Sequence, residues 1–313
     1  MTVTITPVSF SLWSTDRAAF AQALGASLLE TGFAIIEGHT IPQSKIDGAH
    51  QAAKDFFALP AEAKHHYFDP KGAGQRGYTP FGTENAKGQS AADLKEFWHT
   101  GRALPQGSPY REFMADTPEV TEVEDFDTDT RDLFEAFDQF GGELLEAIAL
   151  YLELPQDWFA DKVDMGNSIL RLLHYPPQDN PPPAGTVRAG AHEDINLITL
   201  LLGAEEAGLQ AKHRSGEWVD VNPPKGALVL NCGDMLQRLT AGKLPSTTHR
   251  VLNPSPERAK FPRYSMPFFL HPNADFLITP LPSCLAEGYV GEPPITALDY
   301  LTERLIEIGL IKP

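Results

Sequence analysis

The sequence is poor in positive charge and has no long apolar run. Its 313 residues include 25 Lys and Arg against 42 Asp and Glu, so the formal net charge is −17. Such a chain is repelled by nucleic acid and anionic lipid, so we expect a small-molecule partner and neither nucleic acid nor membrane. No stretch of about eighteen apolar residues occurs, and the N-terminus lacks a basic region followed by an apolar one. A cytoplasmic location is the default expectation.

Cysteine is also scarce. Cys232 and Cys284 are the only two, and they lack the close spacing of a metal-binding pair. They suggest a reducing compartment, and we expect two buried thiols.

Four regions follow one another along the chain. Residues 1–118 mix helical and strand patterns: Ser14-Thr15-Asp16 can cap a helix that Gly32 stops, and Pro42 suits the first turn of a second helix. Residues 119–165 contain an acidic linker and a long amphipathic helix, whose apolar stripe runs from Leu133 to Leu152. Residues 166–280 are strand-like, and 281–313 form a C-terminal helical segment.

The strand-like region predicts the core of the fold. Short apolar strands separated by turns rich in Pro, Gly, Asn and Ser are typical of a double-sheet jelly-roll barrel, which holds a small ligand in its mouth. We expect an α+β, mainly β protein in which this double-stranded β-helix is braced by the N-terminal helices and the long central helix. The candidate strands are 168–175, 195–202, 208–211, 218–221, 227–231, 247–252, 264–270 and 276–278.

One glycine-rich stretch imitates a cofactor motif. Residues 72–77, Gly-Ala-Gly-Gln-Arg-Gly, match the dinucleotide-binding pattern by letter. That pattern requires a strand before it and a helix after it, whereas Pro80 opposes a helix here. We interpret the stretch as a loop.

His192-Glu-Asp194 and His249 are the candidate metal ligands. On one strand, His192 and Asp194 would point to the same face, because side chains alternate. His249 follows the β-branched pair Thr247-Thr248, which indicates a neighbouring strand. Two imidazoles and one carboxylate that leave coordination positions open are typical of non-haem Fe(II) oxygenases. Since a lone His-x-Asp pair is a common chance match, the interpretation depends on its surroundings.

Other side chains indicate an anion site in the same barrel. Arg263 and Ser265 would share one strand face, a pairing suited to a carboxylate. Arg171 and Tyr175 would share a face of strand 168–175, where an arginine either meets an anion or lies at an exposed edge. The segment Asn231-Cys-Gly-Asp234 is interpreted as a structural turn.

Together these motifs resemble the Fe(II)- and 2-oxoglutarate-dependent oxygenases, in the branch that includes isopenicillin N synthase and the plant flavonoid and gibberellin oxygenases. The resemblance covers nearly the whole chain. It implies Fe(II) bound by His192, Asp194 and His249, with O2 as oxidant. It also implies 2-oxoglutarate as cosubstrate, its distal carboxylate held by Arg263, Ser265 and Tyr175. Its most specific segments are His192-Glu-Asp194, Gly208-Leu-Gln, Gly216-Glu-Trp218-Val, Asn231-Cys-Gly-Asp234, Thr248-His249-Arg-Val and Arg263-Tyr-Ser265.

The resemblance implies the oxidation of a small organic metabolite by hydroxylation, desaturation or ring closure, with release of succinate and CO2. Residues 1–118 would then be an N-terminal region of the non-haem dioxygenase type, and 166–280 the catalytic core. Leu173 stands where plant members have an asparagine, and Arg171 is a candidate to replace that amide. The interval from His249 to Arg263 is long for the branch, which predicts a longer loop.

The substrate is the least determined feature. Tyr78, Phe97, Trp98 and Phe269 are candidates for the cavity wall, although core packing is an equally good interpretation of each. Candidates for a polar contact are Glu84 and Arg102. Two other functions stay open: an Fe(II) oxidase of the same branch that works without 2-oxoglutarate, and a non-enzymatic jelly-roll sensor with a bound metal. The sequence does not specify the oligomeric state.

Overall fold

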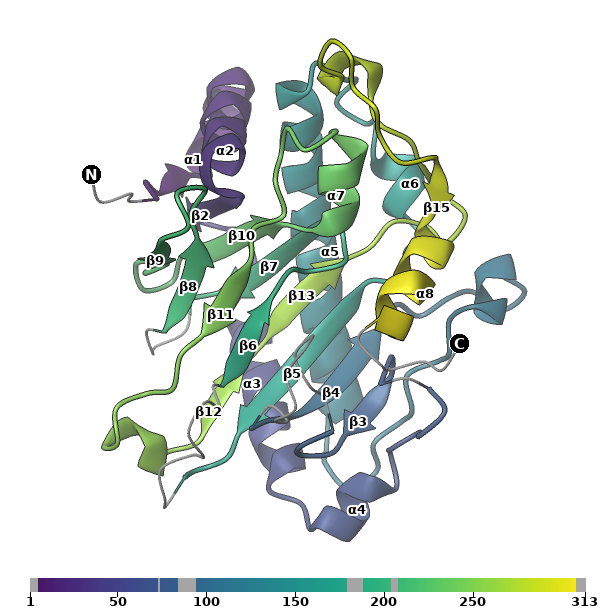
Figure 1. Cartoon of the computed structure of the whole chain (residues 1–313). Helices are drawn as coiled ribbons and strands as arrows, with labels where there is room; N and C mark the ends of the chain where they lie inside the picture. The colour runs from purple at the N-terminus through teal and green to yellow at the C-terminus, as the bar shows by residue number, and fades with distance from the viewer. Residues whose placement is uncertain (1–4, 73, 84–93, 179–187, 204–207, 308–313) are drawn as a thin grey trace.

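Two antiparallel sheets face each other at the centre of the computed structural model, which describes residues 5–72, 74–83, 94–178, 188–203 and 208–307 (Figure 1). The larger sheet has the order β1 (Val8–Ser9), β2 (Phe33–Glu37), β10 (Leu228–Cys232), β7 (Ile198–Leu202), β13 (Pro267–Leu270), β5 (Ile169–Tyr175), β4 (Glu96–Gly101) and β3 (Gly77–Thr79), with β12 (Arg263–Ser265) also paired to β5. The smaller sheet has the order β6 (Ala189–His192), β11 (His249–Val251), β8 (Leu209–Lys212) and β9 (Trp218–Asp220). Every pair is antiparallel except β1 with β2. The expected jelly roll with bracing helices is confirmed.

Helices cover the outer face of the larger sheet (Figure 1). Asp16 caps α2 (Arg17–Thr31) by accepting a hydrogen bond from the Ala19 amide, and Gly32, in the left-handed region at φ 71°, ends it, as its sequence predicts. After Pro42 comes α3 (Gln43–Phe57). The shorter helices are α1 (Ser11–Thr15), α4 (Ala61–His65), α6 (Ala160–Val163), α7 (Asp234–Leu239) and α8 (Ala297–Glu307), with 3-10 turns at Pro109–Glu112, Arg258–Lys260 and Pro282–Cys284.

The long helix α5 (Phe126–Tyr151) is the brace that its apolar stripe predicts. Phe137 stacks on Phe268 of β13, with ring centroids 5.4 Å apart and an interplanar angle of 4°. Gly141 lies directly over Leu270, where a Cβ atom would collide with that side chain. The helix therefore packs against the central strands of the larger sheet, on the face opposite the barrel interior.

Alternation along β5 separates the core from the barrel interior. Leu170, Leu172 and His174 face the helices, and His174 stacks on Phe57 of α3. Leu173 and Tyr175 face the opposite way, toward the smaller sheet. Successive side chains on a strand of the larger sheet thus point in turn to the helix layer and to the barrel interior.

Several elements differ from the sequence-based expectation. The strand expected at 264–270 is two strands, because Pro267 has no amide hydrogen with which to continue the ladder. The strands β1, β3, β4 and β15 (Ile295–Thr296) were not predicted, whereas β14 (Leu277–Ile278), which pairs with β15, falls within the expected strand 276–278. A strand was expected at His192, but the bounds of β6 were not. Cys232 is buried as expected, but Cys284 is only half-buried. None of the helices in the described ranges is both long and apolar enough to cross a bilayer.

Candidate metal centre

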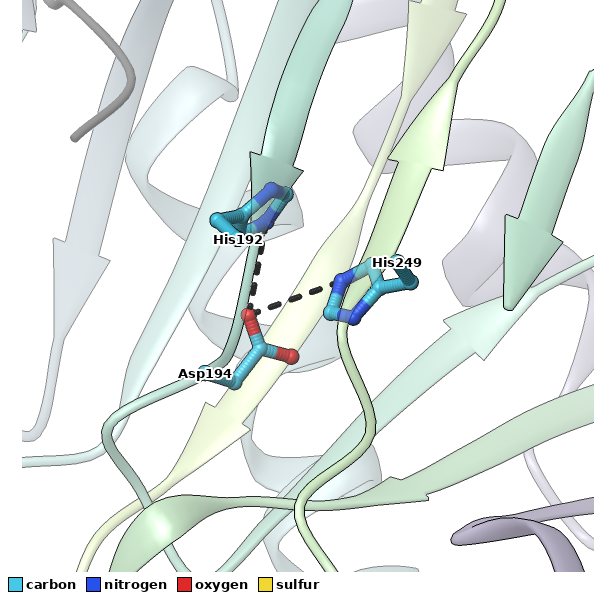
Figure 2. Close-up of side chains that lie close together, drawn as sticks. All are labelled: His192, Asp194 and His249. Atoms are coloured by element: carbon cyan, nitrogen blue, oxygen red, sulfur yellow. Dashed lines mark ion pairs between the residues drawn. The ribbon is translucent and has the colours of Figure 1, made fainter. Parts of the chain in front are cut away.

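His192 and His249 face each other across the two neighbouring strands β6 and β11, where they are direct partners in the register (Figure 2). Asp194 lies two residues beyond the end of β6, so the expected strand alternation is wrong for this residue. A hydrogen bond from the Asp234 amide at the start of α7 to the Asp194 carbonyl fixes the backbone there. One carboxylate oxygen, Oδ1, lies 3.7 Å from Nε2 of His192 and 3.8 Å from Nε2 of His249.

Hydrogen bonds on the far side of each imidazole fix its orientation. Nδ1 of His192 lies 2.7 Å from the Gly190 carbonyl, and Nδ1 of His249 lies 3.1 Å from the Thr247 carbonyl. Because a carbonyl can only accept, both Nδ1 atoms must donate, which leaves the Nε2 lone pairs free to bind a metal. One ligand atom from each of the three residues fits within 4.8 Å, and no other group of this kind occurs in the described part of the chain.

The second carboxylate oxygen of Asp194 is held by two neutral donors. Thr199 on β7 donates its hydroxyl at 2.6 Å, and Asn231 on β10 donates its amide at 2.8 Å. Asn196 in turn donates to the Thr199 hydroxyl at 2.9 Å. Sequence reasoning assigned Asn231 only to a turn and missed Thr199. The two residues show no local motif, because they are neighbours only across the β7–β10 pairing.

The electrostatics prepare these groups for a cation. Burial alone would raise the pKa of Asp194, but the two imidazoles and the donors Thr199 and Asn231 outweigh it, so the pKa lies below its ordinary value. The pKa of His192 is lowered to about 4, chiefly because surrounding protein atoms displace water from the ring and, second, because of repulsion by His249. At neutral pH the site therefore offers an ionised carboxylate and a neutral His192 ring. This donor set suits Fe(II) with open positions.

A cationic cluster lies on the same interior face. Arg263 on β12 is the direct partner of Tyr175 on β5, and its Cζ lies 5.4 Å from the tyrosine ring centre. Ser265 is the partner of Leu173, so it shares this face. A second arginine, Arg188, immediately precedes β6, and its Cζ also lies 5.4 Å from the Tyr175 ring centre. Sequence reasoning missed Arg188, and alternation from His192 could not have found it, because an irregularity in the β6–β11 pairing shifts the register between the two residues.

Arg171 occupies a different position. Its Nε donates to Nε2 of His99 at 2.6 Å, and its Cζ lies 4.3 Å from the Phe97 ring centre and 5.3 Å from that of Phe269. The strand β5 has partners on both sides, so the exposed-edge interpretation is wrong. Phe269 is the partner of Thr199, which binds Asp194. The group of Phe97, His99, Arg171 and Phe269, called here the Arg171 cluster, therefore lies on the metal-facing side.

Three of the candidate substrate residues lie elsewhere. Trp98 is fully buried in the helix layer, 4.9 Å from Phe56 and 5.0 Å from Phe126 between ring centres. Tyr78 donates to Glu96 on the same face. Arg102 pairs with Asp138 of α5 at 2.9 Å. The core-packing interpretation therefore holds for Trp98 and Tyr78, and Arg102 has a structural partner. Glu84 lies outside the described residues.

Comparison with known proteins agrees with this geometry. Residues 166–272 match the family profile of the 2OG-Fe(II) oxygenase superfamily, and residues 5–121 match that of the non-haem dioxygenase in morphine synthesis N-terminal region. A 2-oxoglutarate-Fe(II) type oxidoreductase of Emericella nidulans is 33% identical over 303 residues, which cover 92% of this chain and 85% of that one.

Solved structures give the same result. A protein from Caulobacter crescentus assigned to the 2OG-Fe(II) oxygenase family is 52% identical, covers 98% of this chain and 100% of its own, and superposes with a TM-score of 0.90. A full-length Neurospora crassa protein, solved in complex with alpha-KG and thymine, is 29% identical, covers 96% of both chains and has a TM-score of 0.85.

The chain belongs to the Fe(II)- and 2-oxoglutarate-dependent oxygenases. It is an oxidoreductase of the dioxygenase type, whose cofactors are Fe(II), 2-oxoglutarate and O2. The family, the fold and the enzyme class expected from the sequence are confirmed.

Proposed function

We propose that His192, Asp194 and His249 hold the Fe(II) of this enzyme, and that Arg263, Ser265 and Tyr175 hold the distal carboxylate of 2-oxoglutarate. The observation that carries the proposal is the convergence of two Nε2 atoms and one carboxylate oxygen within 4.8 Å, at the interior end of the smaller sheet. The reaction oxidises a small organic molecule and converts 2-oxoglutarate to succinate and CO2.

Each residue has a defined task in this assignment. Gly190 and Thr247 keep the imidazoles in the tautomer that presents Nε2, while Thr199 and Asn231 keep Oδ1 of Asp194 turned toward the metal position. Bound Fe(II) would supply the activation of dioxygen, and three protein ligands would leave coordination positions open for it. The arginine and serine of β12 orient the cosubstrate through its distal end.

The Arg171 cluster forms the substrate side of the site. Its two phenylalanine ring centres lie 4.3 and 5.3 Å from the guanidinium carbon of Arg171, and a guanidinium group binds acceptor atoms through its N–H edge. A small molecule with a carbonyl or carboxylate group fits this arrangement. The binding of thymine by the Neurospora neighbour supports a substrate of that size.

The test of the cosubstrate site is an anaerobic titration of the Fe(II) protein with 2-oxoglutarate, followed by the weak visible charge-transfer band of a chelated keto acid. We expect the band in the wild type and its loss in Arg263→Gln. Arg250→Gln is the matched control, since Arg250 lies next to His249 but binds Gln210 and stacks on Trp218. Iron binding without a band would instead favour an oxidase that works without 2-oxoglutarate.

The test of the metal site is Asp194→Ala. This change removes the one anionic ligand, so we expect the loss of Fe(II) binding and of turnover while the circular dichroism spectrum stays that of the wild type. An undiminished iron affinity in the folded variant would refute the ligand assignment.

A further inference from the structure

Arg188 is the residue in the barrel interior that the family motifs leave without a role. It is 2% exposed and immediately precedes β6, the strand that ends at the metal-binding imidazole of His192. Its guanidinium carbon lies 5.4 Å from the ring centre of Tyr175, itself 2% exposed. Arg188, next to a strand of the smaller sheet, therefore lies against Tyr175 of the larger sheet.

The same tyrosine ring lies 5.4 Å from the guanidinium carbon of Arg263. The two guanidinium groups are therefore at most twice that distance apart, and Tyr175 lies between strands from opposite sheets. Arg171, by contrast, is four residues from Tyr175 along β5, about 13 Å at roughly 3.3 Å per residue. Of Arg171 and Arg188, therefore, only Arg188 lies against the Tyr175 ring that Arg263 also contacts.

A carboxylate has enough acceptor sites for both arginines. Its two oxygens offer about four lone pairs, so it can accept from Arg263 and Ser265 and still accept from a further guanidinium group. Arginine presents its donors in a flat fork and stays charged at every physiological pH, which makes a paired-arginine site selective for an anion over a neutral group of the same size.

We propose that Arg188 is a second arginine for the distal carboxylate of 2-oxoglutarate, and that it makes the cosubstrate site selective for keto acids that carry this second carboxylate. The proposal rests on the proposed function, in which Arg263 and Ser265 bind the same group. In this proposal His192, at the end of β6, binds the metal, and Arg188, the residue before β6, binds the far end of the cosubstrate.

The test compares two keto acids by direct binding. Isothermal titration calorimetry, without oxygen and with saturating Mn(II) in place of Fe(II), measures the affinity for 2-oxoglutarate and for 2-oxopentanoate, which lacks the distal carboxylate. Arg188→Gln should weaken 2-oxoglutarate about 10- to 100-fold, as expected for the loss of hydrogen bonds to a charged group, and should leave 2-oxopentanoate unchanged. Arg188→Lys, which retains the charge, should recover part of the loss. Arg250→Gln is the control.

Each result is decisive. Equal weakening of both keto acids by Arg188→Gln would mean that Arg188 only shapes the pocket, and an unchanged affinity for 2-oxoglutarate would mean that it does not reach the carboxylate; either overturns the proposal. Arg263→Gln separates this from a failure of the proposed function. If Arg263→Gln weakens 2-oxoglutarate and Arg188→Gln does not, only the second arginine is refuted. If neither does, the carboxylate site itself is misplaced.

Discussion

The hydroxyl of Thr199 offers a direct test of how the protein prepares its metal ligand. Thr199→Val removes the hydroxyl but keeps the shape of the side chain, so the change acts on hydrogen bonds and leaves no cavity. The hydroxyl donates to Oδ2 of Asp194 at 2.6 Å and accepts from Asn196 at 2.9 Å, and all three residues are buried. Two consequences follow, one for the metal and one for stability.

The expected loss of metal affinity can be estimated from the structure. A hydrogen bond to a charged group contributes about 1.5–3 kcal/mol, and each 1.4 kcal/mol corresponds to about a tenfold change in affinity. Because the bond from Asn231 remains, the carboxylate keeps one of its two donors. We therefore expect metal affinity to fall about 10- to 100-fold. The buried amide of Asn196 also loses its acceptor, which should lower the free energy of unfolding by about 1–3 kcal/mol.

The assay is a titration of the metal-free protein with Mn(II), well below the melting temperature of the variant. Thr199→Ser retains the hydroxyl and should keep most of the affinity, while Thr15→Val removes an exposed hydroxyl from α1 and should change neither quantity. A folded Thr199→Val variant with the metal affinity of the wild type would refute the idea that this hydrogen bond orients Asp194.

Three further predictions concern stability. Arg102→Ala leaves Asp138 without its partner and should lower the free energy of unfolding, by up to about 3 kcal/mol, with no effect on 2-oxoglutarate binding. Glu96→Gln removes the charge that Lys64 and His174 face in the helix layer, so urea unfolding should shift to lower concentration at unchanged Mn(II) affinity. Burial, and then the charge of Arg76, lowers the pKa of His271 from 6.5 to about 4. The unfolded chain therefore binds the extra proton between about pH 6.5 and 4, and native stability should fall as the pH drops through this window, by about 2 kcal/mol at pH 5. His271→Asn should reduce that slope in urea unfolding at pH 7 and 5; an unchanged slope would contradict the assignment.

The helices were predictable because their signals are local. Asp16 caps α2, Gly32 ends it in the left-handed region, and the stripe of α5 repeats every three or four residues. The strand β6 was not predictable in this way. Its sequence, Ala189-Gly-Ala-His192, has weak strand propensity, and its pairing with β11 holds it in place. Asp194 shows the same limit, because its position depends on a hydrogen bond from the start of α7, 40 residues later in the sequence.

The substrate candidates show why a face cannot be chosen from one strand. Phe97 and Trp98 are adjacent, so alternation sends them to opposite sides of β4, yet both are large, aromatic and buried. Only tertiary packing decides between them: Phe56 and Phe126 pack on Trp98 in the helix layer, and Arg171 packs on Phe97, which faces the barrel interior.

The sequence by itself determined the family, the jelly-roll architecture and the identity of the three candidate ligands, because each is indicated by residue types within short stretches of the chain. The tertiary structure alone decided that Thr199 and Asn231 hold Asp194, that Trp98 belongs to the core, and that Arg188 stands beside Tyr175 and Arg263. The physical reason is that these contacts join strands whose pairing is set by the burial of whole sheet faces. No short stretch of sequence contains both partners of such a contact.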